Sequence, residues 1–289
     1  MRRKQSDEMQ VQGVEFRNLL ILARKEMFEA LRNRWFIFYS ATFTVLTFSI
    51  SFLSLAGADQ YGFAGFNRTA AGLVNLVMLI VPLMALSAGA ASIAGERERG
   101  TLAQLLAMPV SRTELLLGKF LGISLALVLA LTIGFGLSAA VMVLQGGSGG
   151  ALAYLSMAGM ACLLAIGMLS IGLMISVITN KSGTAAGASI VVWLGLAFVS
   201  DLGLMGSSVL FRLQLWSLFD AALANPLEVF KMATLSSSQA ALSVLGPVGR
   251  YANYTFGHAL GLLFLGLLTA WIAVPLVLAW RIFRHSEIA

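Results

Sequence analysis

The sequence predicts an all-α membrane protein with six transmembrane helices, and three observations lead to this fold class. Of the 289 residues, 58% are hydrophobic and only 11% are charged, whereas a soluble domain carries about 25% charged residues. Six apolar runs are each long enough to cross a hydrocarbon core of about 30 Å as a helix. The runs are continuous rather than alternating, so they do not match the strands of a membrane barrel.

The predicted elements divide the chain into two parts. A cytoplasmic N-terminal segment, 1–35, precedes a transmembrane domain, 36–289, which contains a cytoplasmic loop and a long extracytoplasmic loop. The predicted spans cover residues 35–57, 73–93, 120–144, 152–178, 184–204 and 259–280, with the two loops at 94–119 and 205–258. Both chain ends lie on one side of the membrane if the number of spans is six.

The distribution of basic residues predicts on which side of the membrane the two chain ends lie. The terminal segments, the 94–119 loop and the 179–183 turn hold 15 of the 19 Lys and Arg residues. The other basic residues are Arg68, Arg212, Lys231 and Arg250. Positive charge collects on the cytoplasmic side of a membrane protein, so we expect a bacterial inner-membrane protein with both termini in the cytoplasm. The net charge of +6 is thereby explained without nucleic acid as a partner.

An amphipathic helix is predicted before the first span. Apolar side chains recur at helical spacing from Phe16 to Leu31, while Arg17, Arg24 and Lys25 fall on other faces. Such a helix can lie in the cytoplasmic interface of the membrane, in contact with lipid. The alternative is a basic flank that only orients the first span.

The cytoplasmic loop after the second span is the most informative part of the sequence. A charged turn at 96–99 is followed by a short helix at 101–108, which stops at Pro109 because proline cannot continue a helix. Ser111 and Glu114, three residues apart, form a capping box that opens the next helix. The sequence therefore predicts a compact helical element, apolar on one side, held at the membrane surface.

The same loop carries a family resemblance. Glu96-x-Glu98-x-Gly100-Thr101-Leu102, then Leu105-Leu106, Pro109, Ser111-Arg112 and Gly118-Lys119 form the pattern. It resembles the cytoplasmic loop in permease subunits of type-2 ABC exporters. The resemblance implies that this loop and the entry helix sit on an ABC ATPase subunit and transmit ATP-driven movement to the spans. The residues given this coupling role are Glu96, Arg97, Glu98, Arg99, Gly100, Thr101, Leu102, Leu105, Pro109 and Arg112. The alternative is a well-capped connector.

The ATPase itself is predicted to be a different chain. Gly118-Lys119 is the nearest approach to a phosphate-binding loop, but Thr113 stands where the first glycine is required and Phe120 follows the lysine. We therefore expect a non-catalytic subunit without a cofactor, with ATP and Mg on a cytoplasmic pair of ATPase subunits. The family resemblance also implies a second copy of this chain.

The extracytoplasmic loop is too long and too apolar for a simple connection. Asn225 can cap a helix that begins with Pro226. The sequence predicts short helices at the outer membrane surface, either as a lid or as a platform for a periplasmic accessory protein. The residues assigned to that partner are Asn225, Pro226, Phe230, Lys231, Arg250 and Tyr251.

The extracytoplasmic loop resembles one particular group within these ABC permeases. Asn225 to Lys231, with the Leu245-Gly-Pro-Val-Gly249 turn, is similar to permeases of nitrous oxide reductase maturation systems. That similarity implies a role in assembling the copper sites of a periplasmic reductase. The chain itself offers no metal site by sequence, since Cys162, His258 and His285 lack the spacing of a metal-ligand set.

Two other functions stay open at the level of sequence. An ABC permease could export a different substrate, since nothing in the spans identifies a cargo. An ion-coupled secondary transporter could also have six spans, although such proteins use ionisable groups inside the membrane and these runs hold very few.

Overall fold

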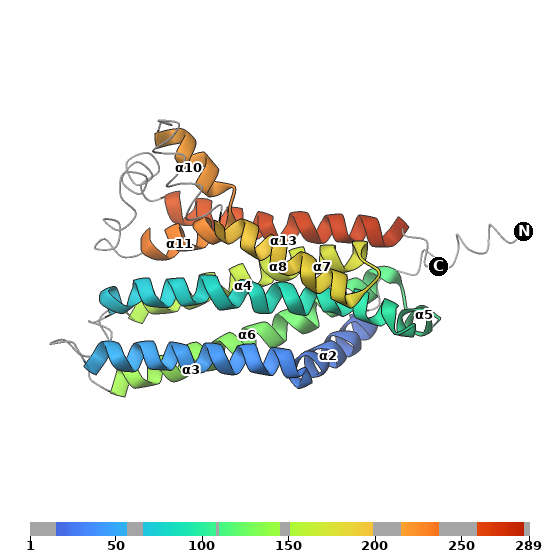
Figure 1. Cartoon of the computed structure of the whole chain (residues 1–289), viewed down its shortest axis with the longest axis horizontal. Coiled ribbons are helices and arrows are strands. Elements are labelled where there is room, and N and C mark those ends of the chain that lie inside the picture. Colours follow the sequence, from blue (N-terminus) through green and yellow to red (C-terminus); the bar gives the residue numbers. More distant parts are fainter. Residues whose placement is uncertain are drawn as a thin grey trace, which may run out of the picture.

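The computed structural model is a bundle of long helices that run along one common axis (Figure 1). It describes residues 16–56, 66–107, 110–144, 151–198, 215–236 and 259–285. Within these ranges every regular element is a helix. The helices are α2 (Phe16–Arg32), α3 (Arg34–Ala56), α4 (Phe66–Glu98), α5 (Thr101–Leu106), α6 (Arg112–Leu144), α7 (Ala151–Ile178), α8 (Ser182–Phe198), α10 (Leu215–Leu223), α11 (Pro226–Ser236) and α13 (Leu260–His285).

Five of the predicted spans are confirmed as helices that are long and apolar enough to cross a membrane: α3, α4, α6, α7 and α13. The sixth, predicted at 184–204, begins as α8, an apolar helix of 17 residues. Residues 199–204 lie outside the described ranges, so the count of six spans stays a prediction. The helix before the first span is present as α2.

The centre of the bundle is α7, which is the most buried of the long helices. In its most apolar stretch 72% of the residues are buried, against 22% in α3 and in α13. Large apolar side chains on the outer helices are exposed, including Leu53 of α3 and Leu262 of α13. A helix that exposes so much apolar surface needs lipid or another apolar partner around it.

Two glycines allow α4 and α7 to cross in close contact. A Cβ added to Gly172 of α7 would lie 2.5 Å from the carbonyl oxygen of Leu86 and 3.1 Å from the Cα of Gly89. A Cβ added to Gly89 would lie 2.7 Å from the carbonyl oxygen of Leu169. Small residues at such crossings let the backbones of membrane helices approach each other.

The same two helices are joined again one turn further along α4. The hydroxyl of Ser176 in α7 accepts hydrogen bonds from the backbone N–H groups of Ile93, at 2.9 Å, and Ala94, at 2.8 Å. These two amides of α4 thus have an acceptor outside their own helix.

The helix pair α10 and α11 lies at the end of the bundle opposite to α5 (Figure 1). A small apolar cluster attaches the pair to the first half of α13, with Phe219, Val229 and Phe264 among its buried members. Leu227 and Phe230 of α11 are fully buried and belong to the main core instead. The helix α11 is therefore part of the bundle and is not a loose surface helix.

Candidate coupling site

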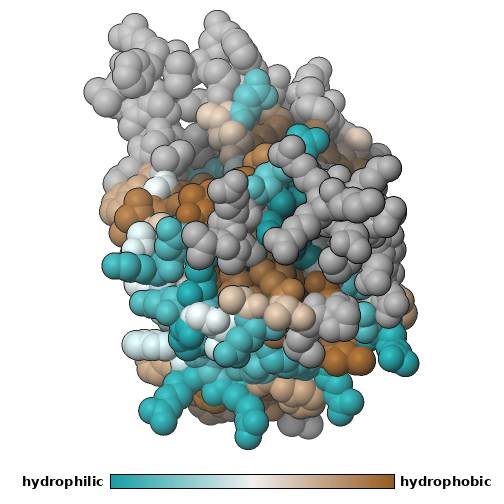
Figure 2. All heavy atoms as spheres, turned by 90° about the vertical axis from the view of Figure 1, so that its right-hand side faces the viewer, coloured by the Kyte–Doolittle hydropathy of each residue, from teal (hydrophilic) through white to brown (hydrophobic). Residues whose placement is uncertain are grey.

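Polar ends of several helices meet at one end of the bundle, which we call the α5 end. It contains α2, α5, the last turns of α4, α7 and α13, and the first turns of α6 and α8 (Figure 1). Figure 2 views the molecule from this end, and hydrophilic side chains gather on the part that is drawn in colour. The loop that the sequence assigned to coupling lies here.

A buried ion-pair cluster joins three helices at this end. Lys119 of α6 donates to Glu26 of α2 at 2.9 Å and to Glu96 of α4 at 2.6 Å. The side chains of Lys119, Glu26 and Glu96 are 1%, 5% and 7% exposed. Removing one partner from such a buried pair costs about 3–5 kcal/mol, because it leaves an uncompensated charge.

Lys25 extends this cluster toward the surface. Its ammonium lies 3.4 Å from Glu26 and 3.2 Å from Glu29, both on α2. Partial burial disfavours the charged form of Lys25, but the carboxylates of Glu26, Glu29 and Glu96 outweigh this effect and raise the pKa of Lys25 above its ordinary value. Lys25 is therefore fully protonated at neutral pH.

The close packing of α2 on α6 places Glu26 next to Lys119. A Cβ added to Gly122 of α6 would collide with the carbonyl oxygen of Ala23, and one added to Gly118 would lie 2.7 Å from the Cβ of Leu22. The helix α2 is thus held against the start of α6 by both a glycine contact and an ion pair.

Arg97, which follows Glu96 in α4, contacts the end of α7. Its Nη1 atom donates to the carbonyl oxygens of Val177, at 3.1 Å, and Thr179, at 2.8 Å, and to Oδ1 of Asn180 at 3.2 Å. The last carbonyls of a helix have no partner inside that helix; Arg97 satisfies the one of Val177 and also the carbonyl of Thr179, the residue after the helix.

Glu98 completes the series by capping α8. Its carboxylate accepts from the backbone N–H of Ser182 at 2.9 Å, and the Ser182 hydroxyl also donates to it. A negative charge is favourable at the first turn of a helix. Three consecutive side chains at the end of α4 therefore contact three other helices, α6, α7 and α8, and Lys119 connects this group to α2 through Glu26.

The start of α6 is held in a similar way. Ser111 and Glu114 form the predicted capping box: the Ser111 N–H donates to Glu114 at 2.7 Å, and the Glu114 N–H donates to the Ser111 hydroxyl at 3.2 Å. Nη1 of Arg112 donates to the carbonyl oxygens of Phe283 and Arg284, both at 3.1 Å. The loop is thereby connected to the last helix, α13.

The short helix α5 turns its apolar side inward. Leu102 is 1% exposed and belongs to the chain's own core, and Leu105 is half-buried against it. Arg99, Gly100 and Gln104 are exposed. The exposed residues of α5 are Ala103 and Gln104, so the apolar side that the sequence predicted for docking faces the chain's own core instead.

One detail of the predicted loop is wrong. The sequence predicted a charged turn at 96–99, but α4 continues through Glu98 and the turn follows at Arg99 and Gly100. Gly100 has φ of 73°, which only glycine adopts without strain. Thr101 begins α5 and its hydroxyl donates to the carbonyl oxygen of Glu96 at 3.2 Å. Pro109 lies outside the described residues.

At the opposite end, the predicted start of α11 is confirmed. Oδ1 of Asn225 accepts from the Leu227 N–H at 3.0 Å, and Pro226 is the first residue of the helix. The amide of Asn225 also donates to the carbonyl oxygen of Leu196 in α8 at 2.7 Å. Asn225 thus ties α11 to the end of α8.

The residues assigned to a periplasmic partner differ in their accessibility. Asn225, Pro226 and Phe230 are buried, while Lys231 is partly exposed and lies 3.3 Å from Glu228. Arg250 and Tyr251 lie outside the described residues. A partner that contacted Phe230 directly would have to displace α11 from the bundle, so the three buried residues position α11 in this structure.

Residue types that bind soft metals do not converge in the described part of the chain. Cys162 is half-buried and packs against the core. Met157 and Met160 stand three residues apart on α7, but Met157 is fully buried in the main core and Met160 packs against both apolar clusters. His285 is exposed at the end of α13, and His258 lies outside the described residues.

The cluster around Lys119 was not predicted from the sequence. One signal was present, because Glu26 falls among Leu22 and Ala23 on the buried side of α2, where an acid is costly unless it is paired. Nothing in the local sequence says that its partner is 93 residues away.

Comparison with known proteins agrees with this architecture. The model of the family described as ABC-2 family transporter protein matches residues 20–288. The chain is 37% identical over 274 residues to "Probable ABC transporter permease protein NosY" of Stutzerimonas stutzeri, covering 91% of this chain and 97% of that protein. It is 35% identical over 277 residues to the protein of the same name from Pseudomonas aeruginosa, covering 92% and 98%. The chain therefore belongs to the ABC-2 transporter family, as a permease subunit with several membrane-spanning helices.

Proposed function

We propose that this permease couples ATP hydrolysis on a separate cytoplasmic ATPase pair to movement of its membrane helices, through α5 and α2. The observation that carries the proposal is the set of contacts made by Glu96, Arg97 and Glu98. These residues directly precede the turn to α5 and contact α6, α7 and α8, and the Glu96 partner Lys119 also binds Glu26 of α2. A force on α5 therefore acts on most of the bundle at once.

The proposal includes six spans and a defined orientation. In this arrangement α8 continues as the sixth span, and the α5 end faces the cytoplasm. The positions of the basic residues support this orientation, since α2, the end of α4, the start of α6 and the end of α13 all carry them. The amphipathic α2 then lies in the cytoplasmic interface, where exposed Phe16 and Ile21 can contact lipid.

A second copy of the chain is part of the proposed transporter. The outer helices α3 and α13 are the least buried of the long helices, and they expose many large apolar side chains. One of these surfaces is available for a second permease without disturbing the core.

The proposed biological role is the assembly of the copper sites of a periplasmic nitrous oxide reductase, together with a periplasmic accessory protein. This role rests on the resemblance of the outer loop to such maturation permeases. The chain's own residues do not argue for copper as a cargo, and the transported species is left open. Lys231 and the exposed part of α10 are the described surfaces nearest to a partner on that side.

The first test is purification of the chain from its native membrane in mild detergent, with identification of the bound proteins. Recovery of an ATPase is the expected result, and recovery of a periplasmic maturation protein would support the narrower role. The chain recovered alone and transporting a solute with an ion gradient would make it a secondary transporter and refute the proposal.

A variant on α5 makes this test specific to the site. Ala103 is exposed on α5, so Ala103→Trp should block the ATPase without entering the core. Leu129→Trp is the matched control, because Leu129 is 44% exposed on the side of α6 within a predicted span. Equal recovery of the ATPase with both variants would show that α5 is not the contact.

A further inference from the structure

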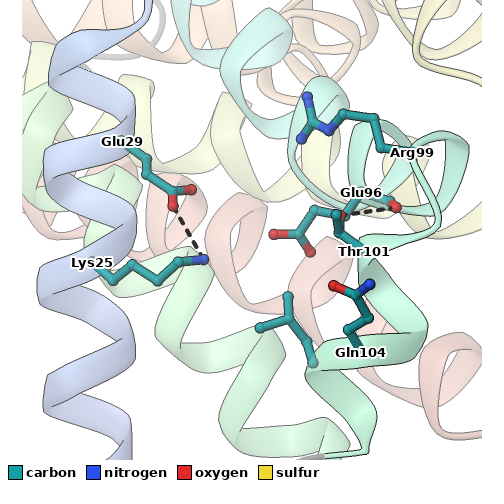
Figure 3. A pocket seen from close by; sticks show the side chains of 7 residues that line it. Lys25, Glu29, Glu96, Arg99, Thr101 and Gln104 are labelled. Atoms are coloured by element: carbon teal, nitrogen blue, oxygen red, sulfur yellow. Dashed lines mark hydrogen bonds and ion pairs between the residues drawn. The ribbon is translucent and has the colours of Figure 1, made fainter.

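We infer that a polar pocket between α2 and α5 receives a positively charged side chain, an arginine or a lysine, from the ATPase subunit. Glu96 and Glu29 would accept its hydrogen bonds. The inference rests on the proposed function, since it assigns a contact within the proposed coupling surface. The pocket has a volume of about 330 Å³ and is lined by Lys25 and Glu29 of α2 and by Glu96, Arg99, Thr101 and Gln104 of the α4–α5 region (Figure 3).

The floor of the pocket holds a carboxylate oxygen without a partner. Oε1 of Glu96 is paired with Lys119, but Oε2 is buried and has no hydrogen-bond partner. Glu96 as a whole is 5% exposed, and its carboxylate points into the space between α2 and α5 (Figure 3). A buried acceptor without a donor is unfavourable, so this position is suited to a group that donates.

The charges around the pocket specify a cation as that group. The carboxylates of Glu26, Glu29 and Glu96 lie within 4.8 Å of one another. Lys25 and Lys119 provide two ammonium groups against these three acids. Arg99 is exposed and also lines the pocket; in Figure 3 its guanidinium lies on the same side as the Glu96 carboxylate, and it does not hydrogen-bond Oε2. With Arg99 the three acids and three bases balance, but the two ammonium groups alone leave one of the three clustered acids uncompensated beside Oε2.

The shape and surroundings favour a side chain over a metal ion. The ammonium of Lys25 already lies 3.2 Å from Glu29, and it would repel a divalent ion bound to the same acids about twice as strongly as a side chain with one positive charge. A long side chain can place its charged head beside Glu96 while its aliphatic stem lies against Leu105, which also lines the pocket. A guanidinium suits this place best, because it donates up to five hydrogen bonds in a plane.

The test measures binding of the ATPase recovered with the wild-type chain to purified full-length variants in nanodiscs. Glu96→Gln should weaken binding about tenfold or more, as expected for a buried charged contact. Glu29→Gln should weaken it about threefold, because Glu29 is 57% exposed. Asp220→Asn, at an exposed acid of α10 at the other end, is the matched control and should bind like the wild type.

A second variant separates docking from folding, since Glu96→Gln also disturbs the pair with Lys119. Gln104→Arg supplies a guanidinium to the pocket from the chain itself. It should raise the thermal unfolding temperature of the free permease and weaken ATPase binding at the same time. Folded Glu96→Gln and Gln104→Arg chains that both bind the ATPase normally would overturn the inference and leave the proposed function intact.

Other occupants give different results. Saturable Mn²⁺ binding to the wild-type permease alone, lost in Glu96→Gln, would identify a metal site and overturn the inference. If Arg99→Ala lowers the unfolding temperature of the free chain as much as Glu96→Gln does, and ATPase binding is normal in both, the occupant is Arg99. If no ATPase binds the wild type at all, the proposed function fails first.

Discussion

Lys119 and Glu96 form an ion pair with a distance of 2.6 Å between Nζ and Oε1, although they belong to different helices and are almost completely buried. The pair lies at the point where α2, the last turn of α4 and the start of α6 meet. It joins the end of α4 directly to α6 and, through the second contact of Lys119 with Glu26, to α2.

Replacing Lys119 by methionine should destabilise the protein by about 3–5 kcal/mol, because Glu26 and Glu96 would be left as buried, uncompensated acids. The measurement is thermal or denaturant unfolding of the purified chain in detergent. Lys181→Met is the control: Lys181 is exposed in the turn before α8, and its loss should change stability by less than about 0.5 kcal/mol. Equal effects of the two substitutions would contradict the buried cluster.

Arg97→Lys should loosen the end of α7. All three contacts, with Val177, Thr179 and Asn180, come from Nη1 at the tip of the planar guanidinium, and a lysine ammonium on a flexible stem would not be held at the same position. We expect a loss of about 1–2 kcal/mol and faster hydrogen exchange in the last turn of α7. Arg281→Lys, at an exposed position of α13, should leave both quantities unchanged. Unaltered exchange in the first variant would argue against capping by Arg97.

Gly172→Ala should separate α4 from α7. The new Cβ would lie 2.5 Å from the carbonyl oxygen of Leu86, and a backbone atom cannot move aside as a side chain can. The expected cost is about 1–3 kcal/mol. Gly187→Ala in α8 places the same methyl group in open space, so it should have no cost and, as alanine favours helix, a small gain. A stable Gly172→Ala protein would mean that the two helices can readily move apart.

Two substitutions of Asn225 should separate its two roles. Asn225→Ala removes both the cap on Leu227 and the bond to Leu196, and we expect a loss of about 2 kcal/mol. Asn225→Asp keeps an oxygen that can cap Leu227 but loses the donor to Leu196. Unfolding measurements should therefore place the aspartate variant between alanine and wild type. An aspartate variant as stable as the wild type would show that the bond to α8 contributes nothing.

Sequence patterns with a local cause predicted structure well. The hydropathy of the apolar runs predicted α3, α4, α6, α7 and α13, since each must be long enough to cross a membrane by itself. The Ser111–Glu114 capping box and the Asn225–Pro226 start were also correct. In both of these helix starts the interacting residues are at most three positions apart, so the local sequence is enough to predict the contact.

Contacts between distant segments could not be predicted in this way. The run of charges after Gly95 looked like a turn, but Glu96 and Glu98 find their partners in Lys119 and Ser182, and these contacts allow α4 to continue. Leu102 was predicted to contact the ATPase, but in the structure it is buried in the chain's own core. In both cases the partner is supplied by helix packing, which periodicity along one segment does not encode.

Ser176 gives two backbone amides near the end of α4 an acceptor on another helix. Because its hydroxyl accepts from Ile93 and Ala94, those two amides remain satisfied even when α4 is over- or under-wound at this point. On the N-terminal side of Ile93, the close contact of Gly89 with α7 resists sliding of α4 along α7. On the C-terminal side of Ala94, Arg97 and Glu98 bind the end of α7 and the start of α8. A twist of α4 applied at Gly100 would therefore be absorbed between Ile93 and Glu96. Ser176→Ala would remove the second acceptor of these amides, and α4 would then resist twisting more strongly.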